Sequence, residues 1–212
     1  MSATTKSSRS ALLRLSIASW CLASLLAGAV AEAATVRSVG FAELVEKSGL
    51  IFEGRVVGES SRMTDDGRDI VTDVEFKVSR VLKGAQSGPR LVLSFSGGQV
   101  GDLTLAVHGS ERPRLGETGV YFVEDPGRRQ AHPFYGWSQG HFLTREDSDS
   151  GVKQMFTRDG RAIVDIRLVA SPDTPVAADS AAAGVDTAPA ETGGAMTLDA
   201  FRTRVARQME RE

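Results

Sequence analysis

The chain has 212 residues, of which 41% are hydrophobic and 25% are charged, and its formal net charge is −2. These values are typical of globular proteins and exclude the disordered and collagen-like classes. The length accommodates one domain of about 100 to 150 residues with appendages. Because the charge is near neutral, the chain lacks the basic surface on which nucleic-acid binding depends, and no nucleic-acid partner is expected.

Residues 1–33 have the pattern of a Sec-type signal peptide. Basic residues precede an apolar stretch over residues 15–30, which ends in Ala31-Glu32-Ala33, a sequence that a signal peptidase accepts. A membrane-spanning helix would need about 20 apolar residues, more than this stretch provides. We therefore expect a periplasmic or secreted protein that begins at Ala34 and has no stable membrane insertion after cleavage. Cys21 is the single cysteine, so the mature chain has no disulfide.

The elements that follow begin with a helix. Phe41, Leu44 and Val45 recur at helical spacing and predict a helix over residues 40–47. From Leu50 the apolar residues alternate, which predicts a strand over residues 50–57. A turn at residues 64–67 contains an Asp-Gly step, a strong signal for a hairpin, and the clearest strand returns over residues 72–79. Its alternation slips at Val81-Leu82, where we expect a β-bulge or a strong bend.

Shorter alternating runs predict further strands over residues 91–95, 103–107 and 120–123, separated by glycine-rich turns. Five short strands and one helix predict a mainly β fold, a small OB-like closed barrel with one N-terminal helix, over residues 34–170. Weaker runs over residues 140–144, 152–156 and 162–168 leave open whether residues 145–170 extend the sheet.

The end of the chain has a different composition. Residues 171–196 are rich in Ala, Pro and Gly and contain few large apolar side chains, which predicts a disordered linker. Thr197 then caps a separate amphipathic helix over residues 197–212. This helix could dock on the barrel, bind a partner or lie on a membrane surface.

Residues 136–140 match the G-x-S-x-G motif of serine hydrolases. That motif requires a helix after the serine, whereas a strand-like run follows Ser138, and the order serine, acid, histidine is not met because His141 alone follows. The three histidines lack the short, regular spacing of metal ligands. The glycine-rich run at residues 97–101 lacks the following helix of a phosphate loop. No catalytic residue, metal or cofactor is therefore predicted.

Seven short segments carry a resemblance: Gly54–Val57, Thr72–Phe76, Val81–Gly84, Gly97-Gly98, Leu115–Glu117, Val120–Val123 and Gly136–Phe142. In this order they resemble a family of uncharacterised exported bacterial proteins over residues 39–144. More remotely, the helix, the first hairpin and the strand ending in Val81-Leu82-Lys83-Gly84 are similar to the OB-fold barrel of the netrin and tissue-inhibitor-of-metalloproteinase superfamily. Inhibitors of that superfamily chelate zinc through an N-terminal cysteine. Ala34 occupies the expected mature end here, so the resemblance does not imply that mechanism.

These observations predict an exported, non-catalytic binding or protein-interaction module, because OB-type barrels present one face and its loops to ligands. The expected partner is a protein, and the oligomeric state is open. The aromatic residues either form an exposed binding surface or cover the end of the barrel. The alternatives are a periplasmic hydrolase that uses Ser138 or a His132/His141 site, and a protease inhibitor or protease-associated partner. The candidate binding residues are Gly97, Gly98, His132, Phe134, Tyr135, Trp137 and His141.

Overall fold

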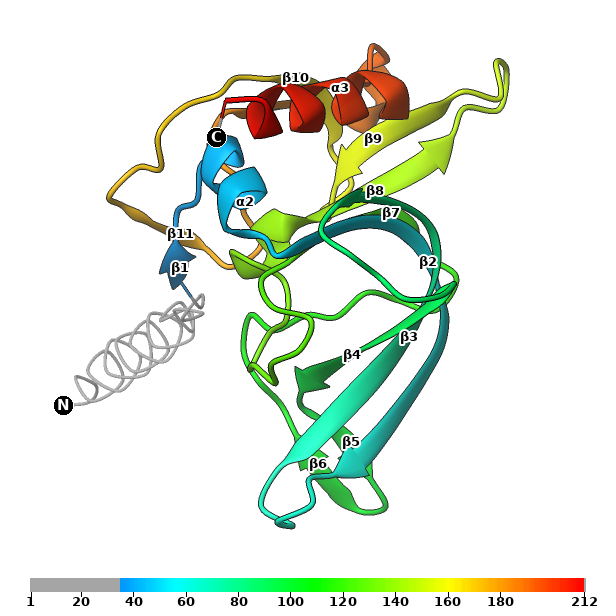
Figure 1. The fold of residues 1–212 in the computed structure, drawn as a ribbon, viewed down its shortest axis with the longest axis vertical. Coiled ribbons are helices and arrows are strands. Elements are labelled where there is room, and N and C mark those ends of the chain that lie inside the picture. Colours follow the sequence, from blue (N-terminus) through cyan, green and yellow to red (C-terminus); the bar gives the residue numbers. More distant parts are fainter. Residues whose placement is uncertain (1–34, 212) are drawn as a thin grey trace, which may run out of the picture. The chain divides into compact units, whose positions relative to one another are not determined.

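An eight-stranded antiparallel sheet organises residues 35–211, the part of the chain that the computed structural model describes (Figure 1). The order of its strands is β12-β10-β9-β8-β7-β2-β3-β4. Their bounds are β2 (Leu50–Met63), β3 (Ile70–Lys83), β4 (Arg90–Ser96), β7 (Thr118–Val123), β8 (His141–Glu146), β9 (Lys153–Thr157), β10 (Ala162–Ile166) and β12 (Val185–Ala188). The fold is mainly β, as predicted.

Smaller elements surround this sheet. Two two-stranded ladders pair β1 (Thr35–Arg37) with β11 (Pro175–Ala177), and β5 (Gly98–Val100) with β6 (Leu103–Leu105). The helices are α2 (Phe41–Lys47) and α3 (Leu198–Met209), with short 3-10 turns η1 (Trp137–Gly140) and η2 (Ala190–Thr192). In residues 35–211 no helix is both long and apolar enough to cross a membrane. The predicted signal peptide, residues 1–33, lies outside the described residues.

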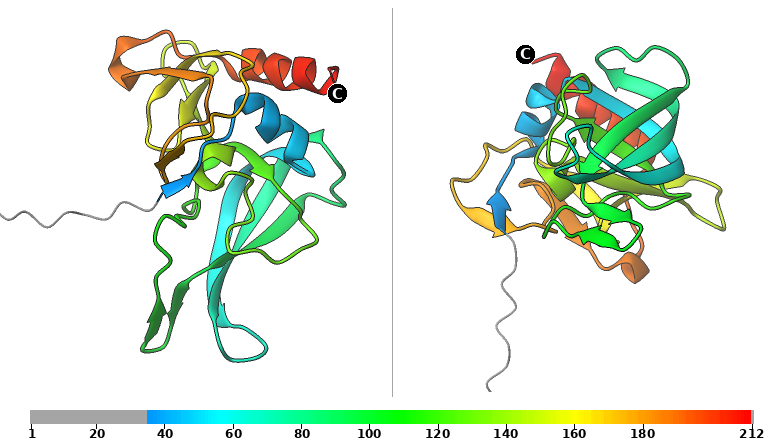
Figure 2. Two further views of the ribbon diagram at one scale, coloured as in Figure 1. Left: turned by 90° about the vertical axis from the view of Figure 1, so that its left-hand side faces the viewer. Right: turned by 90° about the horizontal axis from the view of Figure 1, so that it is seen from below.

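The long hairpin of β2 and β3 follows from local signals in the sequence. At its tip the N–H of Gly67 donates to the carbonyl oxygen of Thr64 at 2.8 Å, and Gly67 has a φ of +68°, which glycine adopts without strain. The register of the two strands shifts at three places, one of them opposite Leu82, which confirms the predicted bulge. Because bulges bend and twist a strand, the hairpin curves strongly (Figure 2).

The predicted closed barrel is not formed. The sheet ends at β4 on one side and at β12 on the other, and no ladder joins these two strands within residues 35–211. After β4 the chain leaves the sheet to form the β5–β6 hairpin, and β7 then returns beside β2. The later strands β8, β9 and β10 continue outward from β7, away from β4 (Figure 1). Residues 145–170 therefore extend the sheet instead of closing it.

The segment predicted to be a disordered linker is integrated into the fold. Its strands β11 and β12 pair with β1 and β10, and Ala178 and Ala182 are buried. The backbone of Ala183 donates to Val39 at 2.8 Å and accepts from Phe41 at 3.0 Å. Small side chains allow this close approach of two backbones. Composition missed the segment because backbone pairing, which nearly every residue can make, holds it in place.

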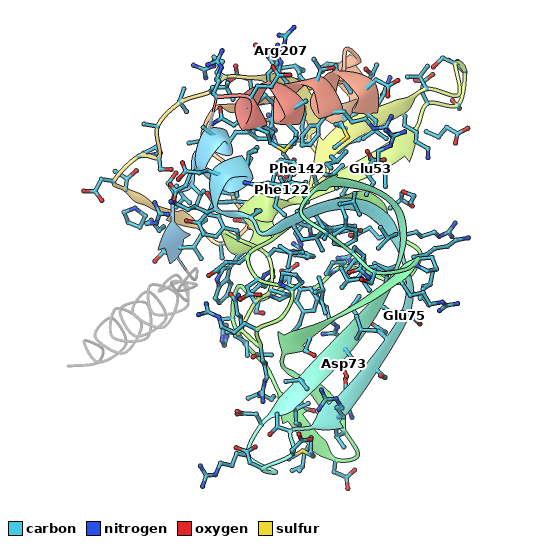
Figure 3. All side chains as sticks on the ribbon, in the orientation of Figure 1. Glu53, Asp73, Glu75, Phe122, Phe142 and Arg207 are labelled. Carbon is cyan, nitrogen blue, oxygen red and sulfur yellow. The ribbon has the colours of Figure 1, made fainter. Side chains whose placement is uncertain are left out.

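The terminal helix α3 docks on the sheet and is not separate. Thr197 caps it as predicted, since its side chain accepts from the N–H of Ala200 at 3.2 Å. The buried face of α3 packs with α2 against β7 and β8, where Phe122 and Phe142 lie beneath it (Figure 3). The ring centroid of Phe201 lies 5.1 Å from that of Phe142. The apolar face of this amphipathic helix is therefore covered by the core of the domain.

Two core clusters lie on opposite faces of β7. Val120 and Phe122 belong to the cluster beneath the two helices, whereas Tyr121 and Val123 belong to a second cluster enclosed by β2, β3 and β4. This alternation follows from the two-residue period of a strand. Phe134, which comes from the loop after β7, completes the second cluster. The position of that loop determines the candidate site.

A partly buried ion pair ties α3 to the sheet, and its loss should be measurable. Arg202 donates from Nε and Nη2 to the Glu53 carboxylate at 2.6 and 2.7 Å, and the Glu53 side chain is only 8% exposed. Arg202→Ala leaves this carboxylate without its partner, so we expect the free energy of unfolding to fall by about 2 kcal/mol. Urea denaturation measures the change. Arg207→Ala, on the exposed side of the same helix (Figure 3), should change stability by less than about 0.5 kcal/mol; equal losses would contradict the role of the pair.

Candidate functional site

The aromatic loop predicted to carry the site is mostly internal. His132, Phe134 and His141 are buried, whereas Tyr135 and Trp137 are half-buried. Phe134 stacks on Tyr121 at 5.3 Å. Of the two alternatives, an exposed surface or a cover, Phe134 fits the cover: it is buried on the second core cluster, because a phenyl ring is more stable against other rings than in water.

Gly97 and Gly98 lie in a different place from the aromatic loop, in a groove beside β5 and β6. Their lack of a side chain has a structural reason. A Cβ on Gly98 would lie 2.4 Å from Thr72 Oγ1 and 2.6 Å from Ser61 Oγ, and both glycines have positive φ. These glycines let the β5–β6 hairpin approach β2 and β3. The predicted binding residues therefore divide between two cavities, and His141 lines neither.

A cavity of about 420 Å³ lies between β1 and the aromatic loop. We call it the aromatic pocket, and its size is in the range of small-ligand sites. The Nε2 of Gln130, at its wall, is buried and has no hydrogen-bond partner. A buried donor of this kind is destabilising unless a ligand or water accepts from it. Its lining residues are Val36, Arg37, Val39, Glu124, Gln130, Ala131, His132, Phe134, Tyr135, Gly136 and Trp137.

Trp137 in this pocket has a strained backbone. Its φ is +61°, and in the described part of the chain it is the only residue other than glycine with a positive φ. Its indole stacks on the ring of His132, with centroids 5.3 Å apart and planes 11° apart. Strain of this kind costs about 1 to 3 kcal/mol and is concentrated at functional sites. The fold thus holds one indole face on a histidine and leaves Trp137 half-buried at the pocket.

His132 is an uncharged support for that indole. Its Nδ1 accepts from the N–H of Phe134 at 3.3 Å, so the ring proton is on Nε2, which faces the carbonyl oxygen of Glu111 at 3.4 Å. Burial lowers the pKa of His132 to about 4. At neutral pH the floor of the aromatic pocket is therefore a neutral ring.

Tyr135 is tied into a polar network at the rim of the aromatic pocket. Its hydroxyl donates to Glu43 Oε1 at 2.5 Å and also lies 3.1 Å from Nη2 of Arg37, which pairs with the same carboxylate. The hydrogen bond from Arg37 is the main cause that lowers the pKa of Glu43 to about 2, and burial together with Glu43 raises the pKa of Tyr135 to about 12. The network joins α2 to the loop and fixes the edge of the pocket.

His141 forms a buried pair with Glu117, a residue that the sequence did not single out. Its Nε2 lies 2.6 Å from Glu117 Oε1, and the Tyr121 hydroxyl donates to the same oxygen at 3.4 Å. The pKa of His141 is lowered because burial outweighs the favourable effect of the carboxylate. The neutral ring therefore donates from Nε2 to Glu117, and Nδ1 is left buried without a partner.

The hydrolase alternative required His141 within reach of Ser138. Ser138 Oγ instead donates to the backbone carbonyl of Ala178, while His141 bonds to Glu117. The structure thus places an acid beside the histidine but uses the serine hydroxyl in a different hydrogen bond. In residues 35–211 no group of three His, Cys, Asp or Glu side chains could hold a metal ion, so His132 and His141 do not converge with an acid as ligands.

Sequence reasoning missed several residues that line the cavities. Gln130 lies in a loop with no motif, and Arg158 lies in the turn between β9 and β10, yet it lines three neighbouring cavities. No local signal in the sequence marks either residue, because their importance comes from hydrogen bonds that the fold leaves unmade.

No protein-family model matches the chain, and no match was found among curated proteins or among solved structures.

Proposed function

We propose that the protein is an exported, non-catalytic binding module that takes its ligand, a surface loop of a partner protein, in the aromatic pocket. The unpartnered Nε2 of Gln130 is the observation that carries the proposal. Once the Gln130 amide, which is covered in the unliganded fold, turns toward the cavity, a ligand oxygen would accept its hydrogen bond. The half-buried Trp137 lines the same cavity and offers an apolar surface.

Export is part of the proposal and rests on the pattern of residues 1–33. We also propose that one half of the sheet, made by β2, β3, β4 and β7, is related to the OB fold. The curvature of these strands around the second core cluster supports that relationship. The loop after β7, together with residues 36–39, lines the aromatic pocket, and loops also form the ligand sites of OB-type folds.

The first test is the capture of partners from the envelope fraction of the organism that encodes the protein. The bait is the chain from Ala34 to Glu212, which contains the whole of the unit that the structure describes. Partners are identified by mass spectrometry and purified for titration. Trp137 is the only tryptophan in this bait, so its fluorescence reports directly on the pocket. We expect a saturable change in this fluorescence on binding.

Gln130→Ala is the decisive variant. It removes the donor on which the proposal depends, and we expect the partner to bind at least about tenfold more weakly, which corresponds to about 1.4 kcal/mol. Stability should be unchanged or slightly higher, because an unsatisfied buried amide is removed. Gln86→Ala is the control, because Gln86 does not line the pocket and its Nε2 already donates to the carbonyl oxygen of Arg90 at 2.8 Å. Unchanged affinity of Gln130→Ala would place the site elsewhere, and the absence of any partner would reject the binding module.

A further inference from the structure

A second cavity, of about 560 Å³, lies between the β5–β6 hairpin and the loop over residues 106–115. We call it the arginine groove, because Arg112, Arg114 and Arg158 line it. It is separate from the aromatic pocket, with which it shares no lining residue. A cavity of this size accommodates a drug-sized molecule or a short stretch of peptide.

Two polar atoms of this groove are buried and have no hydrogen-bond partner. They are the Nε of Arg158 and the Oγ of Ser110. Arg158 is held by Glu111 through Nη2, so its guanidinium is fixed in place while its Nε–H points to no acceptor. Both atoms can donate, and an incoming oxygen ligand would satisfy them. Two unpaired donors in one cavity favour a ligand that has hydrogen-bond acceptors.

The charges of the groove favour an anion. Arg112 pairs with Glu59 at 3.4 Å, and Arg158 pairs with Glu111. The guanidinium of Arg114 has no carboxylate partner in the described part of the chain, so the lining carries one unbalanced positive charge. Arginine binds carboxylates through a planar fork of N–H groups, which suits this unpaired side chain.

An apolar residue stands next to the unpaired arginine. Leu115 lines the groove with 64% of its surface exposed, although a leucine is more stable when it is covered. Pro113, two residues earlier, is buried and anchors this stretch. A partner that combines a carboxylate with an apolar side chain therefore fits the groove better than a small inorganic anion does.

We infer that the arginine groove binds an acidic peptide segment of a partner protein, with a carboxylate held by Arg114 and Arg158 and an apolar side chain against Leu115. The Ser110 hydroxyl donates a further hydrogen bond to the segment. This site is independent of the aromatic pocket, and either could exist without the other.

The test uses the ¹⁵N-labelled chain from Ala34 to Glu212 and the peptide acetyl-Glu-Leu-Glu-amide as the probe. The Nε–H signal of Arg158, assigned with Arg158→Lys, is followed by NMR. We expect a saturable shift with a Kd of about 1 mM or below. Arg114→Gln should weaken binding at least tenfold, and Ser110→Ala should weaken it a few-fold without loss of thermal stability.

The matched control is Arg207→Gln, which removes the same charge from the exposed side of α3, at the end of the described unit away from β5 and β6 (Figures 1 and 3). It should change the Kd less than twofold. The inference is overturned if acetyl-Lys-Leu-Lys-amide produces the same shifts, if Arg207→Gln weakens binding as much as Arg114→Gln, or if no saturable shift is seen. Tighter binding of inorganic phosphate would also overturn it and indicate a small-anion site. Because Trp137 fluorescence reports the other pocket, failure here is distinguishable from failure of the proposed function.

Discussion

Phe201→Ala should lower the free energy of unfolding by about 3 to 5 kcal/mol, the range for removal of a buried phenylalanine. The side chain is fully buried, and its ring packs against those of Phe41, Phe122 and Phe142, with distances between ring centroids of 5.1 to 6.3 Å. The substitution leaves a cavity between α3 and the sheet. Urea denaturation of the chain from Ala34 to Glu212, followed by circular dichroism, measures the loss.

Phe201→Leu is the matched variant for this prediction, because it keeps an apolar side chain in the same space and should lose clearly less stability than the alanine variant. A separate helix would behave differently. If α3 were only tethered to the sheet, both variants would unfold at the same urea concentration as the wild type. That result would contradict the docked helix.

Acidification should destabilise the protein by about 3 kcal/mol between pH 7 and pH 4, before most carboxylates are protonated. His132 has a pKa of about 4 in the fold and an ordinary pKa of 6.5 when unfolded. The unfolded chain therefore binds the proton first, and stability that is present above pH 6.5 is lost as the pH falls toward 4. His141, whose pKa is also lowered, acts in the same direction. Glu43, with a pKa of about 2, loses its contribution only at lower pH.

Free energies of unfolding at a series of pH values test this prediction. His132→Phe keeps an aromatic ring under Trp137 and removes the titrating group, so its stability should vary less steeply over this interval. His108→Gln is the control, because His108 is exposed. In this variant the free energy of unfolding should change with pH as it does in the wild type. Equal slopes for all three proteins would show that buried histidines do not govern acid sensitivity.

Acid sensitivity also concerns the aromatic pocket. The same ring of His132 that resists protonation supports the indole of Trp137 at 5.3 Å. Protonation would place a hydrogen on Nδ1, which accepts from the N–H of Phe134 at 3.3 Å, and would thereby remove a hydrogen bond that holds this loop. We therefore expect ligand binding in this pocket to weaken over the same pH interval.

Local structure was predictable from the sequence because its causes are local. The strand that starts at Leu50, the Asp-Gly step ending at Gly67, the slip at Leu82 and the cap at Thr197 each depend on neighbouring residues, and each appears in the structure as predicted. Periodicity identified the later strands as well. It did not determine which edges pair, and that is why a closed barrel was expected where an open sheet formed.

The sequence by itself thus determined most of the elements, the hairpin turn and the mainly β class. Only the tertiary structure decided that residues 171–196 join the sheet, that Phe134 is internal, and that Gln130, Ser110 and Arg158 keep unpartnered donors. The physical reason is that backbone pairing and side-chain burial depend on surfaces brought together from distant parts of the chain. Composition records which side chains are present, whereas a site depends on which of their hydrogen bonds the fold leaves unmade.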